Sequence, residues 1–314
     1  MRKTCLNMVH ELARQDERVV FIGSDLGAGT LDAMRDEFPD RFFMEGVNEQ
    51  NMIGMAAGMA MEGYIPFVNT IATFITRRCY EQVAVDLCLH NLPVKLIGNG
   101  GGLVYAPLGP THLAIEDVAI MRSLPNMAVF APCDAEEMTR LVHRTMDLSG
   151  PCYIRLAKGG DPVVSEAGHG FAIGEAIEMA PPAAIAFITT GVTTTRALEA
   201  VEVLAARGIE AGVLHHHTLK PLDGAAVLRY ADSAEVLITV EEHLLAGGLG
   251  SMVAELLAER RGGRAPMLRR LGIPDRFPEK YGSQDELFAH FGLDPEGLVD
   301  AALSAASRPQ ADAA

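Results

Sequence analysis

The first half of the chain repeats one unit, in which a short run of β-branched or aromatic residues precedes a longer stretch with helical spacing. The runs are almost wholly apolar, as is typical of parallel strands that helices cover on both faces. The expected strands are residues 19–23, 42–44, 66–69, 94–98, 127–131 and 152–156. The expected helices are residues 4–13, 30–37, 49–61, 74–90, 114–123 and 135–148. This alternation predicts right-handed βαβ crossovers in a doubly wound parallel sheet.

A second, smaller α/β unit follows a polar stretch that is rich in glycine and proline. We expect a first domain at residues 1–160, a linker at 161–175 and a second domain at 176–304. The strands expected in the second domain are residues 184–189, 210–214, 234–240 and 267–271, and the helices are 194–207, 225–230 and 249–261. The alanine-rich residues 305–314 are expected to form a frayed, disordered tail.

Composition narrows the class of protein. The chain has 314 residues, 49% of them hydrophobic, which suits two folded domains and excludes a disordered scaffold. The net charge of −15, without a run of Lys or Arg, argues against a nucleic-acid partner. Five scattered cysteines without a Cys-x-x-Cys pair suit reduced thiols in the cytoplasm. No apolar run reaches the ~20 residues of a membrane span, so we expect no membrane partner.

The glycine run at residues 98–102 is a candidate nucleotide-binding loop. It follows an expected strand, but it lacks the third glycine of G-x-G-x-x-G and no helix start comes directly after it. The Walker A pattern is also absent from the sequence. The run is therefore interpreted as a turn or binding loop, not as a dinucleotide site.

Glu49 is the first candidate for chemistry. Asn48 is a good N-cap, so a carboxylate in the first turn is also explained by the helix dipole. Residues 53–61 carry no charge, which predicts a helix buried on every side, with Gly54 and Gly58 letting another backbone approach. An acid at the start of such a helix would lie beside a dry interface, where functional carboxylates occur.

His112 is the second candidate. It lies in Gly-Pro-Thr-His and precedes Glu116 and Asp117. In a structural interpretation, Thr111 caps the next helix, the imidazole is a satisfied, partly buried side chain, and the two acids are solvated. In a functional one, the imidazole lies at the carboxyl end of a parallel sheet and exchanges protons near neutral pH.

Several motifs resemble, in order, the C-terminal two-thirds of transketolase and of 1-deoxyxylulose-5-phosphate synthase. The resemblance covers residues 2–303, and the order of the motifs makes it specific. The motifs are Gly46-Val47-Asn48-Glu49-Gln50; Thr73-Phe74 with Arg77, Tyr80 and Gln82; Asn91-Leu92-Pro93-Val94; Gly109-Pro110-Thr111-His112; Arg122-Ser123-Leu124-Pro125-Asn126; Lys220-Pro221-Leu222-Asp223; and Val240-Glu241-Glu242-His243 with Gly247-Gly248-Leu249-Gly250.

The resemblance implies a thiamine diphosphate pyrimidine-binding domain followed by a transketolase C-terminal domain. The family's diphosphate-binding domain holds Mg²⁺, or Ca²⁺, through Gly-Asp-Gly and a downstream Asn. Here Gly160-Asp161-Pro162 lacks the second glycine, and no asparagine follows Asn126. The resemblance therefore implies that diphosphate and metal are bound mainly by a separate N-terminal subunit, in an α2β2 heterotetramer.

The resemblance also assigns cofactor-binding positions. Glu49 matches the glutamate that hydrogen-bonds and thereby activates the aminopyrimidine ring of the cofactor, which makes it catalytic. Phe74 matches the ring that stacks on the aminopyrimidine, although an ordinary core aromatic is the alternative. Ile71 and Arg77 flank Phe74 at three residues on either side. Asp25 matches an acidic position near the cofactor, and a helix N-cap explains it equally well.

Substrate positions follow in the same way. His112 matches a catalytic histidine that contacts the reacting substrate carbons. Arg155 and Arg2 match arginines that grip the sugar phosphate, although a terminal arginine is usually just solvated. Leu108 stands where transketolases carry an aspartate that recognises a substrate hydroxyl, and Gly100 stands where they carry a phosphate-contacting histidine.

Further departures are Gly29, where the family has a serine, and the run His215-His216-His217. Three consecutive residues on a strand point to alternating faces, so we expect structural roles for these histidines and no metal site. The motif at residues 241–243 is expected to serve the fold and an interface.

The sequence thus predicts the C-terminal subunit of a split transketolase, which transfers a two-carbon ketol unit between a ketose and an aldose, at least one of them phosphorylated. One alternative is the β subunit of a 2-oxoacid dehydrogenase, which Gly-Pro-Thr-His argues against. Another is a subunit of a synthase that decarboxylates pyruvate. A non-catalytic scaffold is the alternative of another class, and Glu49 together with His112 argues against it.

Overall fold

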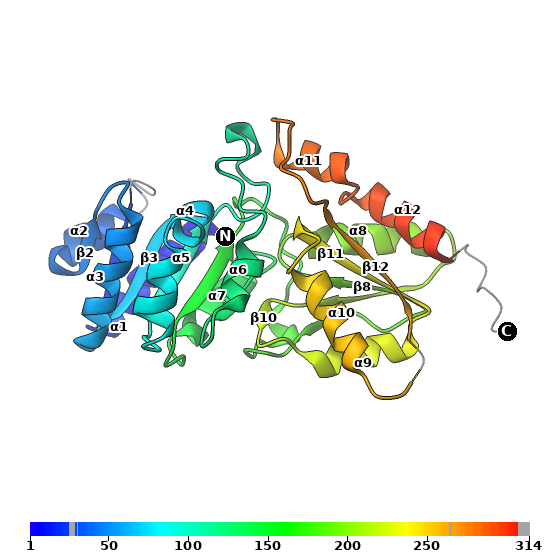
Figure 1. Cartoon of the computed structure of the whole chain (residues 1–314), viewed down its shortest axis with the longest axis horizontal. Helices are drawn as coiled ribbons and strands as arrows, with labels where there is room; N and C mark the ends of the chain where they lie inside the picture. The colour runs from blue at the N-terminus through cyan, green and yellow to red at the C-terminus, as the bar shows by residue number, and fades with distance from the viewer. Residues whose placement is uncertain (25–28, 30, 264, 307–314) are drawn as a thin grey trace.

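The computed structural model describes residues 1–24, 29, 31–263 and 265–306. They form two α/β domains side by side, the first running from blue to green in Figure 1 and the second from green to red. None of the helices in these ranges is long and apolar enough to cross a membrane.

A seven-stranded sheet organises the first domain, in the order β10-β5-β6-β4-β3-β1-β2. Six strands are parallel and belong to this domain: β1 (Val19–Gly23), β2 (Phe42–Met44), β3 (Ile65–Ile71), β4 (Lys95–Asn99), β5 (Ala128–Phe130) and β6 (Cys152–Leu156). The seventh, β10 (Thr218–Lys220), comes from the second domain and pairs antiparallel with β5. The parallel sheet is confirmed, and this antiparallel edge was not predicted.

Helices cover both faces of this sheet, as a doubly wound fold requires. Phe67 and Ile97 pack on one side in the core of α1 and α7, while Val68 and Leu96 pack on the other in the core of α3 and η2. The helical segments of the first domain are α1 (Arg2–Gln15), α2 (Asp32–Glu37), η1 (Pro39–Arg41), α3 (Glu49–Met61), α4 (Ala72–Thr76), α5 (Tyr80–Gln82), the π-helix η2 (Val83–Cys88), η3 (Ala106–Leu108), α6 (Asp117–Ser123) and α7 (Ala135–Thr145). The single helix expected at 74–90 is wrong, because the chain forms α4, α5 and η2 there.

The second domain has a five-stranded sheet in the order β12-β11-β8-β9-β7, with only β7 antiparallel. Its strands are β7 (Ile177–Ala180), β8 (Ile185–Thr189), β9 (Ala211–His215), β11 (Val236–Leu244) and β12 (Met267–Ile273). Its helices are α8 (Thr193–Ala205), α9 (Gly224–Ser233), α10 (Leu249–Glu259), α11 (Gln284–Phe291) and α12 (Pro295–Ala306). The pattern missed β7, α11 and α12. The expected tail begins inside α12, and residues 307–314 lie outside the described residues.

The two domains share one hydrophobic core. Met121 and Tyr153 of the first domain belong to the same buried cluster as Ile188 and Leu219 of the second. The linker, which contains η4 (Ala167–His169), is also tied back to the first domain. Asp134 accepts hydrogen bonds from the backbone N–H groups of residues 164 and 165 and from the hydroxyl of residue 165. The joint between the domains is therefore a packed interface.

Helix α3 is not buried on every side, and that expectation is wrong. Its inner face is buried, but Gly54, Gly58 and Met61 are exposed on its outer face. A Cβ atom built on either glycine would meet nothing within 4 Å. The structure therefore leaves an uncharged helix face open, where another backbone could approach closely.

Candidate functional site

Glu49 lies at the first turn of α3, where the carboxyl ends of β1 and β3 meet. Its side chain is 2% exposed and its two oxygens have different partners. The hydroxyl of Thr70 donates to Oε1 over 3.4 Å, and the hydroxyl of Ser24 donates to Thr70 over 2.9 Å. Nη1 of Arg78 donates to Oε2 over 2.6 Å. A buried carboxylate thus sits between a hydroxyl chain and a guanidinium.

Phe74 lies on α4, close to Glu49 through a shared neighbour. The Cζ atom of Arg78 lies 4.0 Å from the centroid of the Phe74 ring, within the range of a cation–π contact. The imidazole of His112 meets the same ring edge-on, with centroids 5.3 Å apart. The structure therefore brings together three of the predicted residues, Glu49, Phe74 and His112, and adds Arg78 to them.

The loop that carries His112 is held by three contacts. Thr73 donates its hydroxyl to the carbonyl of His112, and Thr111 pairs with the imidazole Nδ1 over 2.9 Å. Arg77 forms an ion pair with Glu116 over 2.9 Å and reaches the carbonyl of Thr111. Burial raises the pKa of Glu116, and Arg77 counteracts the shift. Thr111 does not cap a helix directly after it, because α6 begins at residue 117.

The sequence reasoning named Arg77 and missed Arg78. The guanidinium of Arg77 points to the His112 loop, whereas that of Arg78 reaches Glu49 and Phe74. The signal was the spacing, since residues i and i+4 of a helix face the same side and Arg78 is four residues after Phe74. Ile71 is buried at the end of β3. Asp25 lies outside the described residues.

A cavity of about 240 Å³ opens beside this cluster. Arg2 and Lys158 supply cationic side chains to its lining, and Leu108 is 49% exposed there. Gly100 has a positive φ of 70°, and a Cβ atom on it would collide with the ring of Tyr105. The phenol of Tyr105 thus occupies the space that a larger residue at position 100 would need. Gly29 also has a positive φ, at 88°.

Arg155 lies away from this cavity, at the joint between the domains. Its side chain is 7% exposed, and its Nε donates to Asp117 over 2.8 Å. Its Nη2 donates to the backbone carbonyls of Ala114 and Glu242. Burial raises the pKa of Glu242 to about 7, against the effect of Arg155. Because these contacts already hold the guanidinium, we do not include Arg155 in the substrate site proposed below.

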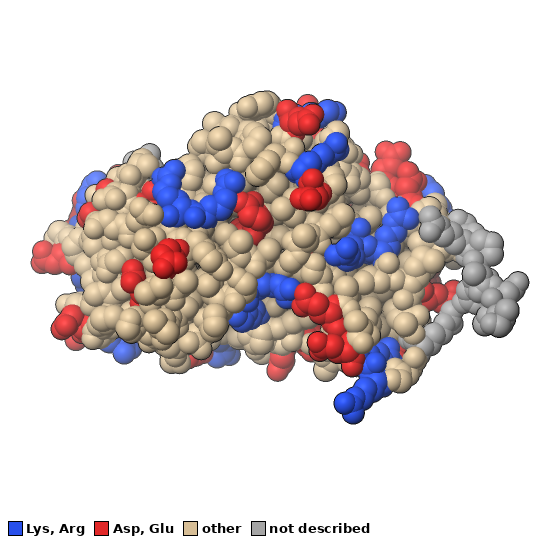
Figure 2. Space-filling view, in the orientation of Figure 1, with Lys and Arg blue, Asp and Glu red and all other residues tan. Residues whose placement is uncertain are grey.

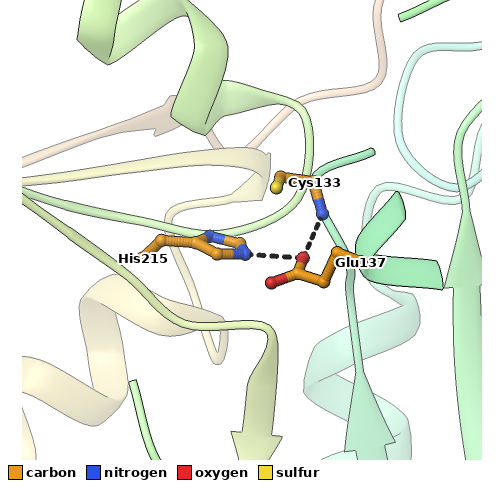
Figure 3. A group of neighbouring side chains, drawn as sticks. All are labelled: Cys133, Glu137 and His215. Atoms are coloured by element: carbon orange, nitrogen blue, oxygen red, sulfur yellow. Dashed lines mark hydrogen bonds and ion pairs between the residues drawn. The ribbon is translucent and has the colours of Figure 1, made fainter. Parts of the chain in front are cut away.

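Charged side chains of both signs are interspersed on the face shown in Figure 2. Across the domain joint, His215 meets the first domain in a buried cluster with Cys133 and Glu137 (Figure 3). The carboxylate of Glu137 accepts a hydrogen bond from the Cys133 backbone N–H over 2.6 Å and pairs with Nε2 of His215 over 2.9 Å. Burial raises the pKa of the Cys133 thiol. The carboxylate and the imidazole are therefore engaged in protein contacts, in line with a structural role.

Comparison with known proteins places this architecture. The family "Transketolase, pyrimidine binding domain" matches residues 1–160, and "Transketolase, C-terminal domain" matches residues 174–298. One of the two subunits of the apulose-4-phosphate transketolase of Phocaeicola vulgatus is 37% identical over 305 residues, covering 96% of each chain. The 6-deoxy-6-sulfo-D-fructose transketolase subunit SqwH of a Clostridium species is 36% identical, covering 98% of this chain and 95% of that one.

A solved structure agrees with these relatives. A split gene transketolase, described as an inactive β4 tetramer, is 35% identical and superposes with a TM-score of 0.88, covering 97% of both chains. The resemblance drawn from the ordered motifs is thereby confirmed. The chain belongs to the transketolase family, of which it carries the pyrimidine-binding and C-terminal domains.

Proposed function

We propose that this chain is the C-terminal subunit of a split, thiamine diphosphate-dependent transketolase that transfers a two-carbon ketol unit between sugars. The observation that carries the proposal is the buried carboxylate of Glu49 beside the ring of Phe74. A planar guanidinium already rests on that ring and on that carboxylate, so the pair accepts a flat group with N–H donors. An aminopyrimidine is such a group, and the residues therefore fit the ring of the cofactor.

Each residue of the cluster then has a defined task. When bound, thiamine diphosphate supplies the carbon nucleophile that lets the bond beside a ketone break. Glu49 holds a proton at a ring nitrogen of the cofactor, in a site from which water is largely excluded. Phe74 supports the ring from one face, and Ile71 lies buried at the end of the adjacent strand. Arg77 keeps the His112 loop in place through Glu116 and Thr111.

The substrate site is proposed to be the cavity beside this cluster. His112 lies between the cofactor position and the cavity's neighbouring loop, where it can exchange protons with the reacting carbons. Arg2 and Lys158 suit the phosphate or another anionic end of a sugar. Leu108 cannot pair with a hydroxyl, so the substrate is expected to differ from those of enzymes with an aspartate there. The two related subunits are themselves named for apulose-4-phosphate and for a sulfonated fructose.

A second subunit is needed to complete this site. The chain lacks the Gly-Asp-Gly and Asn pair through which the family holds the diphosphate and its Mg²⁺ or Ca²⁺. The outer face of α3, formed by Gly54, Gly58 and Met61, is open and uncharged next to Glu49. We propose that an N-terminal, diphosphate-binding subunit covers this face in an α2β2 assembly. The five free, buried cysteines support a cytoplasmic site of action.

Reconstitution tests this proposal. The chain is purified alone and with a partner of about 250 to 300 residues that contains the Gly-Asp-Gly and Asn motif, the size of the missing unit. Turnover of ketose and aldose phosphates is expected only from the mixture supplied with thiamine diphosphate and Mg²⁺. Turnover of pyruvate or branched 2-oxoacids instead would favour the synthase or dehydrogenase alternatives. Turnover by the chain alone, or cofactor binding without any activity, would contradict the proposal.

A further inference from the structure

The guanidinium of Arg78 touches both surfaces that the proposed function assigns to the cofactor ring. Its Nη1 lies 2.6 Å from Oε2 of Glu49, and its Cζ lies 4.0 Å from the centroid of Phe74. A guanidinium is flat, cationic and rich in N–H donors, so it satisfies a carboxylate and a ring face at once. The ring of the cofactor would need the same carboxylate oxygen and the same ring neighbourhood.

The two residues of this ion pair differ sharply in exposure. Glu49 is 2% exposed, so its carboxylate would be costly to leave without a partner. Arg78 is 41% exposed, so its side chain can turn into solvent without burying or stranding a charge. Breaking the pair is therefore tolerable only when another group takes over the carboxylate.

The charge state of Glu49 depends on few neighbours in the described part of the chain. Arg78 is the cation that contacts it, and the Thr70 hydroxyl is its other hydrogen-bond partner. Cys79 lies close enough to feel the carboxylate, but burial raises the pKa of its thiol to about 12, so it stays neutral. Arg78 thus holds Glu49 in its ionised form before any ring arrives.

We infer that Arg78 gates the ring site: it occupies Glu49 and Phe74 in the free protein and is displaced into solvent when the cofactor ring binds. The inference rests on the proposed function of the site. On displacement, one proton from solvent forms an O–H bond on Glu49, and this O–H donates to a nitrogen of the ring. Cofactor binding is then coupled to the uptake of one proton.

Calorimetry on the reconstituted complex tests the gate without measuring turnover. Thiamine diphosphate is titrated with Mg²⁺ in buffers of different ionisation enthalpy, which gives both Kd and the protons exchanged. The wild-type complex is expected to take up close to one proton per site. In Arg78→Met the unpaired carboxyl is expected to be protonated beforehand, so uptake falls toward zero and Kd decreases about tenfold.

Arg144→Met is the matched control, because it removes one exposed arginine from α7. It should bind the cofactor as the wild type does. Equal proton uptake in Arg78→Met and Arg144→Met, or weaker binding in Arg78→Met, would overturn the gate. Failure of the wild-type complex to bind the cofactor would instead overturn the proposed function, and the gate with it.

Arg78→Lys keeps the test decisive if Arg78→Met does not fold. Lysine keeps the charge beside Glu49 but lacks the planar fork that covers Phe74. It is expected to keep the proton uptake and to bind the cofactor more tightly than the wild type by a smaller factor. Wild-type affinity in Arg78→Lys would show that the stacked guanidinium does not obstruct the ring.

Discussion

The carboxylate of Glu137 lies 2.9 Å from Nε2 of His215, although the two residues belong to different domains. Both side chains are fully buried. Nδ1 of the same imidazole pairs with the hydroxyl of Thr194 over 2.7 Å, so both ring nitrogens are engaged. The imidazole and its neighbouring charge lower the pKa of Glu137 to about 2 against the effect of burial. This pair links the two sheets beside the shared core.

His215→Ala is expected to destabilise the chain. It leaves the buried Glu137 carboxylate without its imidazole partner, and loss of one member of a buried pair typically costs about 3–5 kcal/mol. Denaturant unfolding of the purified chain measures the change. His290→Ala, at the exposed end of α11, is the control and should leave the free energy of unfolding within about 0.5 kcal/mol. Equal stability of both variants would show that the pair does not join the domains.

His216 and His217 predict an acid-sensitive fold. Burial lowers the pKa of His216 to about 3 and that of His217 to about 4, well below the ordinary value of about 6.5. Below pH 6.5 the unfolded chain therefore binds protons that the folded chain does not. Stability should fall as pH decreases from 6.5 toward 4, by up to about 1.4 kcal/mol per pH unit for each histidine.

Denaturant unfolding at pH 7, 6 and 5 measures this slope. His216→Gln should flatten it, because one of the two depressed groups is then missing. The same free energy of unfolding at pH 7 and pH 5 in the wild type would contradict the prediction.

Lys158→Met tests the anionic end of the substrate site. The side chain lines the cavity next to Arg2, so its loss should raise KM for a phosphorylated sugar by tenfold or more. The change should leave the melting temperature of the chain unaltered, since Lys158 is exposed. Lys3→Met, an exposed lysine on α1 that is not among the cavity residues, is the control. A KM that shifts equally in both variants would place the phosphate elsewhere.

Gly58→Phe tests the open face of α3. A phenyl ring on this exposed position meets no atom of the chain, so the folded chain should remain intact. The ring would obstruct a partner that packs closely against the helix. Association with the diphosphate-binding subunit, measured by analytical ultracentrifugation, should weaken at least tenfold, whereas Arg144→Phe on α7 should associate normally. Normal association of Gly58→Phe would move the interface away from α3.

How far the sequence predicted this structure depended on local pattern. Strands β1, β2 and β6 and helix α3 were predicted to the residue, because each apolar run is continuous and ends at a clear polar or glycine boundary. Strands β7 and β10 have only four and three residues, too few to show a period. Helix α11 carries a capping box at Ser283 that went unread.

The site shows the same limit. Glu49, Phe74 and His112 belong to motifs that the sequence displays directly. The role of Arg155 depends on Asp117 and Glu242, which are 38 and 87 residues away and come near only in the folded chain. The contact between Arg78 and Glu49 joins residues 29 apart, so sequence alone could not choose between Arg77 and Arg78.

The central claim is that the Glu49 carboxyl activates the cofactor ring. The most direct measurement is the rate of ketol transfer by the reconstituted complex carrying Glu49→Gln, compared with Glu62→Gln at the other end of α3. We predict a loss of about 10²- to 10⁴-fold for Glu49→Gln, the range for removing a proton-transferring group, and no loss for Glu62→Gln. Equal rates in the two variants would contradict the account.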